Sequence, residues 1–138
     1  MKLITKNSDY AIRALVYLAK KKNEFVSSAE IAKKEGIPLM FLRRVLPELL
    51  KRKIIVSKEG VKGGVFLRRA SQTITVTEVI KIFQGDIQLS QCMFRNAFCI
   101  NRKTCVLRKK IISIGKMVER KFDKITIRDL TGKTKEKR

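Results

Sequence analysis

The spacing of apolar residues predicts three helices in the first part of the chain. Apolar side chains recur on one helical face over 8–21, and a shorter stripe of small apolar residues covers 28–35. A third pattern with leucine and valine at helical spacing covers 39–53. Pro47 lies inside this third segment, so we expect a kink or an early break there, because proline removes one ladder hydrogen bond.

Polar residues at the ends of these segments match helix caps. Ser8 or Asp9 is placed to cap the first helix. Glu30 lies three residues after Ser27, which fits a capping box at the start of the second helix. Gly36 is expected to end that helix, because glycine adopts the left-handed conformation without strain.

A β-prone run at 54–57 and a short return at 65–67 flank a glycine-rich, basic turn at 58–64, which predicts a hairpin. Two helices joined by a glycine turn and followed by a hairpin are typical of a winged helix-turn-helix, whose second helix enters the major groove of DNA. We expect Arg43 and Arg44 to read base edges, since arginine donates two coplanar hydrogen bonds to guanine. The wing glycines are expected to let the backbone approach a phosphate. The predicted DNA-contacting residues are Ser28, Leu39, Met40, Arg43, Arg44, Lys51, Lys53, Lys58, Lys62, Gly63 and Gly64.

A short helix is predicted over 77–83, and the strongest helical pattern of the chain runs over 106–122. Leu107, Ile111, Ile114 and Val118 step by four, three and four residues, which resembles a heptad seam between two helices. The stripe is longer than one small domain can cover, so it favours a subunit interface. Packing of the helix onto its own domain remains the alternative.

The charge balance narrows the function. The 138 residues include 33 Lys and Arg against 12 Asp and Glu, a formal net charge of +21. Such a charge indicates a polyanionic partner, with nucleic acid ahead of an anionic membrane. No apolar run approaches the roughly 18 residues of a spanning helix, and the first residues do not resemble a signal peptide. We therefore expect no membrane association and a cytoplasmic location.

Enzymatic activity is not expected. The chain has no histidine, which removes the commonest general base and the usual serine and cysteine triads. It also contains no nucleophile elbow, Walker loop or dinucleotide fingerprint.

Three cysteines lie within fourteen positions, with spacing C-x6-C-x5-C at Cys92, Cys99 and Cys105. In a cytoplasmic protein an odd count argues against a disulfide framework. A zinc ribbon would need close pairs and four ligands. Three thiolates can instead surround one face of an iron–sulfur cluster whose remaining ligand comes from elsewhere. Three unligated cysteines remain the alternative.

Taken together, these features resemble the winged-helix regulators of the Rrf-two family, which has IscR-like and NsrR-like members. The matching segments are Met1-Lys2-Leu3 with Ser8 to Leu15, the helix-turn-helix from Ile31-Ala32 to Leu50, the wing from Gly60 to Leu67, the three-cysteine loop, and Ile125 to Leu130. The resemblance implies a homodimer held by the long C-terminal helices. It also implies a [2Fe-2S] or [4Fe-4S] cluster on Cys92, Cys99 and Cys105 that controls binding to a pseudo-palindromic DNA site.

The fourth cluster ligand is where the chain departs from part of the family. IscR-like members have a histidine three positions after the third cysteine, and Arg108 stands there in this chain. NsrR-like members can use an aspartate of the first helix of the partner subunit, and Asp9 occupies the matching position. Asp9 is also a natural helix cap, so capping and ligation are both open.

The sequence thus predicts a mainly α fold with a small β-hairpin wing: a winged helix-turn-helix followed by a long dimerisation helix. Residues 1–85 are assigned to DNA binding, 86–106 to the cysteine loop, 107–131 to dimerisation and the C-terminal segment, and 132–138 to a disordered basic tail. The predicted function is a sequence-specific repressor whose cluster senses redox state, nitric oxide or iron. The alternatives are a cluster-free regulator with thiol, zinc, small-molecule or partner input, and a basic module that binds RNA or ribosomes.

Overall fold

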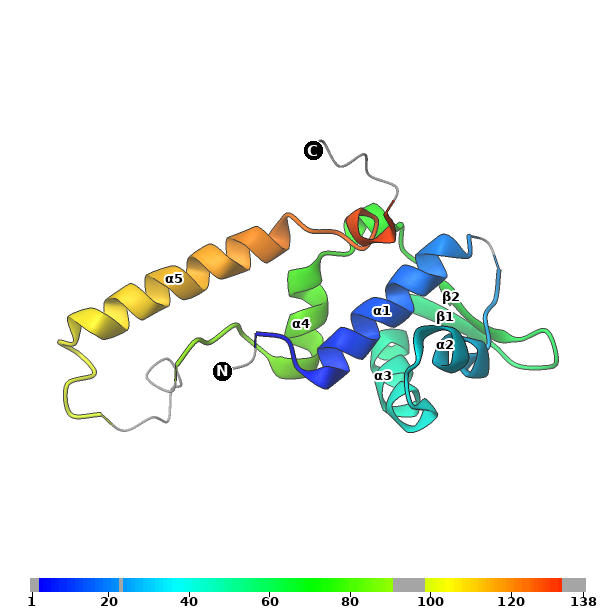
Figure 1. The fold of residues 1–138 in the computed structure, drawn as a ribbon, viewed down its shortest axis with the longest axis horizontal. Coiled ribbons are helices and arrows are strands. Elements are labelled where there is room, and N and C mark those ends of the chain that lie inside the picture. Colours follow the sequence, from blue (N-terminus) through cyan, green and yellow to red (C-terminus); the bar gives the residue numbers. More distant parts are fainter. Residues whose placement is uncertain (1–2, 23, 91–98, 133–138) are drawn as a thin grey trace.

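The computed structural model describes residues 3–22, 24–90 and 99–132. This part of the chain is mostly helical, with one antiparallel two-strand hairpin, which confirms the predicted fold class (Figure 1). The elements are α1 (Lys6–Lys20), α2 (Ser28–Glu35), α3 (Leu39–Lys51), β1 (Ile55–Lys58), β2 (Gly64–Leu67), η1 (Ser71–Thr73), α4 (Val76–Gln84), α5 (Val106–Asp123) and η3 (Asp129–Thr131).

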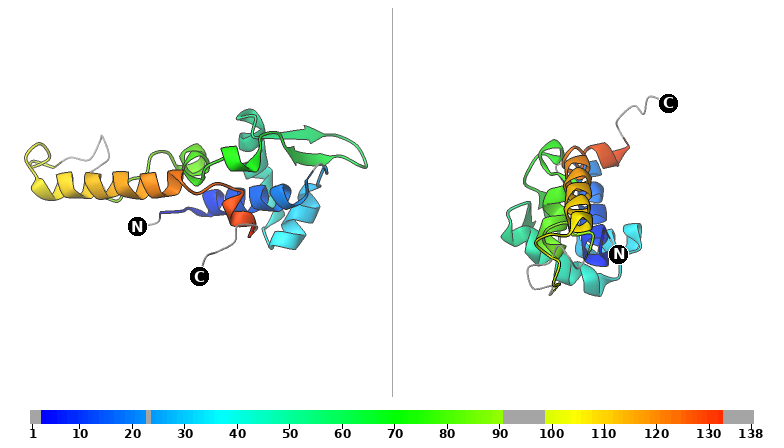
Figure 2. Two further views of the ribbon diagram at one scale, coloured as in Figure 1. Left: turned by 90° about the horizontal axis from the view of Figure 1, so that it is seen from above. Right: turned by 90° about the vertical axis from the view of Figure 1, so that its left-hand side faces the viewer.

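Helix α1 is the centre of the compact part of the molecule, where it contacts α2, α3, α4, β2 and η3. Leu15 of α1, Leu42 of α3 and Val79 of α4 are fully buried between these elements. Helix α5 extends away from this body as an arm, which the left-hand view of Figure 2 also shows. After α5 the chain returns to the body, where Ile127 is fully buried and donates its N–H to Ile74 at 2.9 Å.

The start of α1 differs from the prediction. Thr5 caps the helix, because its Oγ1 accepts the N–H of Ser8 at 3.4 Å, so the prediction of Ser8 or Asp9 as the cap is wrong. Ser8 is fully buried instead, and its hydroxyl donates to Oε1 of Gln84 at 2.7 Å. Asp9 lies within the first turn of the helix.

The ends of α2 follow the sequence pattern. Oγ of Ser27 accepts the N–H of Glu30 at 3.1 Å, and Gly36 ends the helix in the left-handed conformation, with φ of 61°. The carboxylate of Glu30 does not close the capping box in the reciprocal sense. It accepts the hydroxyl of Tyr17 at 2.7 Å and so links α2 to α1.

Helix α3 continues through Pro47 to Lys51, so the expected early break is wrong. Leu46 and Leu49, on either side of the proline, are both buried in the core. Their burial stabilises the helical conformation against the lost ladder bond, since each buried leucine contributes on the order of 2 kcal/mol.

The hairpin has an added pairing that the sequence pattern did not indicate. Strands β1 and β2 pair with Ile55 opposite Leu67 and Lys58 opposite Gly64. Val26, just before α2, forms an isolated antiparallel bridge with Val65, with N···O distances of 2.9 and 2.8 Å. This bridge attaches the hairpin to the helix-turn-helix.

Helix α4 connects the hairpin to α5. The Arg69 guanidinium, which follows β2, forms an ion pair with Glu78 on α4. Two further contacts join α4 to α5: the Thr77 hydroxyl donates to the carbonyl of Glu119, and Lys81 forms an ion pair with the Glu119 carboxylate. No helix in the described part of the chain is both long and apolar enough to cross a bilayer.

Candidate DNA-binding face and cysteine segment

Helix α3 presents a basic face to solvent. Arg43, Arg44 and Lys51 are exposed, and Met40 at the start of the helix is 60% exposed. The opposite face is buried against α1 and α2. The burial of one face therefore fixes which side chains can reach a major groove, and the predicted base-reading pair lies on the open face. Leu39, in the first turn, is half-buried.

The turn between α2 and α3 is held by contacts from α1. Arg13 donates from its guanidinium to the carbonyl of Glu35 at the end of α2. The ring of Tyr10 packs edge-on against Phe41, with centroids 5.2 Å apart. These contacts fix the angle between the two helices of the motif. Ser28, another predicted contact, lies half-buried in the first turn of α2.

The wing carries exposed cations, as predicted. Lys58 and Lys62 are exposed on it, and Lys53 is exposed just before β1 with a positive φ of 60°. Gly63 and Gly64 have a packing role that the sequence did not indicate. A Cβ on Gly63 would lie 2.1 Å from the carbonyl oxygen of Lys58, and one on Gly64 would lie 2.3 Å from that of Val26. Their contact with phosphate stays a prediction.

Two aromatic residues support the wing and were missed by sequence analysis. Phe25, before α2, packs on Phe66 of β2 with centroids 5.4 Å apart. The ammonium of Lys58 lies over the ring of Phe25 at 5.8 Å. In the sequence Phe25 follows two polar residues and belongs to no periodic apolar pattern, so only its contact with Phe66 shows its role.

Cys105, at the start of α5, lies at the other end of the molecule from the wing (Figure 1). Cys105 caps the N-terminus of α5, and its Sγ accepts the N–H of Arg108 at 3.4 Å. Cys99 is exposed and Cys105 is half-buried, both as free thiols. Cys92 lies outside the described residues. Residues 99–118 contain six basic and no acidic side chains.

These two thiols suit the cluster that the resemblance implies. Thiolates are the usual ligands of iron–sulfur clusters, and a backbone N–H directed at sulfur stabilises the thiolate form. Within the ranges that the structure describes, no three Cys, Asp or Glu side chains converge as a metal site.

Asp9 is on the exposed side of α1, with its side chain 52% exposed and its carboxylate 3.5 Å from the Arg13 guanidinium. Figure 1 shows the start of α1 well separated from the start of α5, and the left-hand view of Figure 2 shows the same separation. One chain thus does not bring Asp9 to Cys99 and Cys105. The predicted DNA-contacting residues, in contrast, lie together on α2, α3 and the hairpin.

Helix α5 leaves an apolar stripe exposed along its first three turns. Leu107 is 67% exposed and Ile114 is 49% exposed, and Val106 and Met117 are exposed beside them. Val118 and Phe122, further along the same seam, pack on the core of the body. The second half of the seam therefore packs on its own domain, as the alternative interpretation expected, and a subunit interface along the first half stays a prediction. The exposed half is the part that favours a subunit interface.

Comparison of the sequence with known proteins finds a family model and relatives that are all described as transcriptional regulators. The family described as "Rrf2: Iron-dependent Transcriptional regulator" matches residues 4–133. A putative HTH-type transcriptional regulator of Aquifex aeolicus is 32% identical over 123 residues, which cover 88% of this chain and 85% of that protein. The HTH-type transcriptional regulator NsrR of Bacillus licheniformis is 31% identical over 129 residues, covering 92% of this chain and 90% of the relative.

Solved structures show the same fold. CymR, described as the global cysteine regulator of B. subtilis, superposes with a TM-score of 0.79 at 24% identity, covering 97% of this chain and 99% of that one. IscR of T. potens superposes with a TM-score of 0.75 at 23% identity, covering 94% of this chain and 85% of that one.

Proposed function

Because the chain belongs to the Rrf2 family of transcriptional regulators, we propose that it is a homodimeric repressor whose binding to pseudo-palindromic DNA is controlled by an iron–sulfur cluster. The observation that carries the proposal is the place of Cys105. This thiol begins the helix whose other end is bonded to the DNA-binding body through Glu119. A change at the thiols can therefore reach the body through one continuous helix.

In the proposed complex, α3 lies in the major groove and the wing follows the adjacent backbone. Arg43 and Arg44 read guanine edges, for which a planar guanidinium is well suited. The lysines at the end of α3 and on the hairpin hold phosphates, which fixes orientation without reading sequence. The hydrogen bond from Arg13 to the Glu35 carbonyl and the bridge between Val26 and Val65 hold α3 and the wing in fixed positions relative to one another.

The exposed stripe of α5 supplies the proposed dimer interface. Two copies of the stripe can bury each other along Leu107, Ile114 and Met117, which in one chain face solvent. A twofold dimer presents two recognition helices, and their separation then selects the spacing of the half-sites.

The proposed cluster ligands are Cys92, Cys99 and Cys105, with Asp9 of the partner subunit as the fourth. Asp9 is exposed, and its helix begins well away from the start of α5, where Cys105 lies, which is consistent with ligation across the dimer. When bound, the cluster would supply iron that reacts with oxidants or nitric oxide. Whether the cluster is present would depend on the supply of iron. The chain itself orients the thiols, and helix α5 carries a conformational change at the thiols to α4.

The first test is the absorbance spectrum, with iron and sulfide analysis, of protein purified without oxygen. We expect brown protein containing iron and sulfide, and loss of both in Cys92→Ala, Cys99→Ala and Cys105→Ala. Thr104→Ser, next to Cys105, is the matched control and should retain the cluster. Asp9→Ala should weaken cluster retention, whereas Asp86→Ala, which removes another exposed carboxylate, should not.

Colourless protein that resists reconstitution would contradict cluster control. The DNA-binding proposal would survive that result, with the exposed thiol of Cys99 as the remaining input. DNA binding is tested separately, by competition between a pseudo-palindromic site and random DNA. Equal affinity for both would instead favour a sequence-independent nucleic-acid module.

A further inference from the structure

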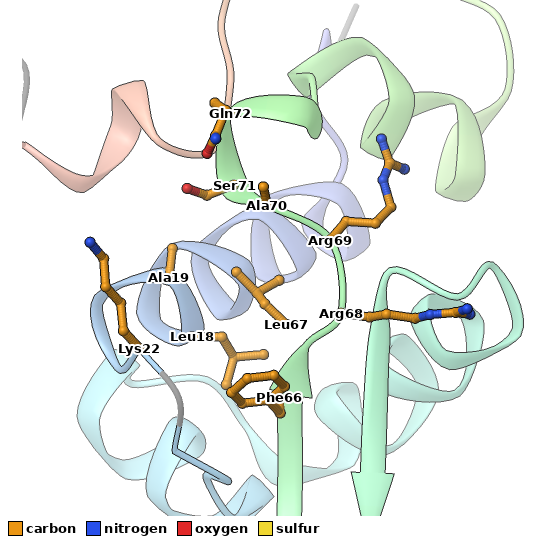
Figure 3. A pocket seen from close by; sticks show the side chains of 10 residues that line it. All are labelled: Leu18, Ala19, Lys22, Phe66, Leu67, Arg68, Arg69, Ala70, Ser71 and Gln72. Carbon is orange, nitrogen blue, oxygen red and sulfur yellow. The ribbon is translucent and has the colours of Figure 1, made fainter.

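A cavity of about 390 Å³ opens between the C-terminal end of α1 and the segment that leads from β2 to α4 (Figure 3). Its apolar floor is formed by Leu18 and Ala19 of α1 and by Phe66 and Leu67 of β2. The cavity contains none of the proposed base-reading residues or cluster thiols. A volume of this size lies at the lower end of the range for small-molecule sites.

The rim of the cavity is polar and carries positive charge. Lys22, Ser71 and Gln72 stand around it, and none of its ten lining residues is acidic (Figure 3). In the part of the chain that the structure describes, the side-chain polar atoms of these three residues make no hydrogen bond or ion pair with protein. These atoms can therefore bind a ligand without breaking a hydrogen bond or ion pair within the protein.

The two arginines of the lining do not compete with Lys22 for this role. Arg69 is committed to the carboxylate of Glu78 and to the carbonyl of Thr73. Arg68 extends away from the other lining side chains in Figure 3. Lys22 is thus the cation of the site, opposite the hydroxyl and amide of Ser71 and Gln72.

We propose that this cavity binds a small organic anion with an apolar body and one carboxylate. The apolar body packs on Leu18 and Leu67, and the carboxylate accepts from the ammonium of Lys22 and the hydroxyl of Ser71. The absence of acidic lining residues and the apolar floor together favour this ligand over inorganic ions and over neutral molecules. The proposal does not depend on the iron–sulfur cluster.

The cavity lies within the DNA-binding body, between elements that position the wing. A molecule in the cavity contacts α1, the wing strand β2 and the connection to α4 at the same time. These three elements set the position of the wing. Ligand binding there is thus a second input to the regulator, separate from the thiols.

The test uses benzoate as the probe, with amide chemical shifts of the isotope-labelled, full-length protein as the readout. We expect saturable shifts at Leu18, Leu67 and Ser71. Benzamide, which keeps the ring and lacks the charge, should bind about tenfold more weakly, as should benzoate to Lys22→Gln; a tenfold change corresponds to about 1.4 kcal/mol. Lys33→Gln, which removes an exposed lysine on α2 outside the cavity, should bind benzoate like the parent protein.

Three results would overturn the proposal. Equal binding of benzamide would mean that the cavity does not select an anion. Equal binding of inorganic phosphate would mean that the apolar floor contributes nothing. Shifts spread over the basic surface, with the same loss in Lys33→Gln as in Lys22→Gln, would mean that benzoate responds only to the overall charge.

Discussion

At the scale of single residues, Glu30 links two helices. Its backbone N–H donates a hydrogen bond to Oγ of Ser27 at the start of α2. Its carboxylate accepts a hydrogen bond from the hydroxyl of Tyr17 in α1. Only the neutral phenol can donate this hydrogen bond, and the carboxylate disfavours a phenolate beside it. The hydrogen bond to Glu30, with burial and the negative charge as further causes, raises the pKa of Tyr17 from 10.0 to about 12.

This shift predicts the alkaline titration of Tyr17. The folded pKa is higher than the unfolded value, so the bond contributes its full stability below about pH 10, and the contribution is lost as the pH rises through about 12. The ultraviolet absorbance of tyrosinate in Tyr10→Phe protein isolates Tyr17. We expect a midpoint near 12, which Glu30→Gln should lower toward 10. A midpoint near 10 in Tyr10→Phe itself would contradict the bond.

The roles proposed for Arg43 and the wing lysines predict different responses. Arg43→Ala should reduce discrimination between the preferred base pair and its substitutes by about 1–3 kcal/mol. Lys62→Ala should weaken binding to all sequences equally and reduce the salt slope by about one. Affinities for a panel of single-base variants at two salt concentrations measure both effects. Unchanged discrimination in Arg43→Ala would exclude it as a base reader.

Residues whose role depends on chain neighbours could be predicted from the sequence. Ser27 and Gly36 are examples, because a cap needs only the backbone of its own helix. Thr5 was missed because the apolar periodicity of α1 begins several residues after the cap. Its hydrogen-bonded neighbour Ser8 is held by Gln84, which is distant in sequence and adjacent only in the fold.

At the scale of elements, the wing depends on close contact with the segment before α2. Gly64 has φ of 148°, and a Cβ added there would approach the carbonyl of Val26 to 2.3 Å. The sequence indicated flexibility and phosphate contact for these glycines. The structure adds a different constraint, because two backbones meet at Gly64 in the Val26–Val65 bridge. Such a bridge between separate segments leaves no local pattern.

The close contact predicts that Gly64→Ala is strongly destabilising. Backbone strain and overpacking each cost about 1–3 kcal/mol, so we expect a loss of about 2 kcal/mol or more in the free energy of unfolding. Gly60→Ala, also at positive φ but with no atom within 4 Å of the added Cβ, should cost less. Urea unfolding followed by circular dichroism compares the two. Equal losses would mean that the approach to Val26 imposes no constraint.

Helix α4 shows why connections between elements were not predicted. Its own pattern was sufficient to place it near 77–83, and the structure extends it to Val76–Gln84. Its function as a connector depends on Thr77 and Lys81, which bond to Glu119 in another helix. The bond to Glu119 raises the pKa of Lys81, although exposed pairs of this kind contribute less than about 1 kcal/mol. Their value is to fix the angle between α4 and α5.

At the scale of the whole molecule, charge and shape have separate consequences. A net charge of +21 attracts any nucleic acid, so affinity alone says little about specificity. The shape of the molecule adds a constraint that charge does not, because the extended helix α5 places Cys105, at its start, far from α3 (Figure 1). Only an assembly that sets two bodies at a fixed separation can convert a change at the arm into a change in half-site spacing.

The exposed half of the α5 stripe therefore predicts that one substitution separates the subunits without unfolding them. Ile114→Glu places a charge in the centre of the proposed interface, where burial without a partner is costly. Light scattering after size exclusion should change from twice the chain mass of 15.9 kDa to that mass, while the helical circular dichroism remains. Lys116→Glu introduces the same side chain on the opposite face and should leave the dimer intact. If Ile114→Glu remains dimeric, the interface lies elsewhere, and ligation of iron by Asp9 of the partner subunit loses its geometric basis. If the monomer forms and still binds one half-site, the DNA-reading face is complete in one chain and the dimer sets only the spacing.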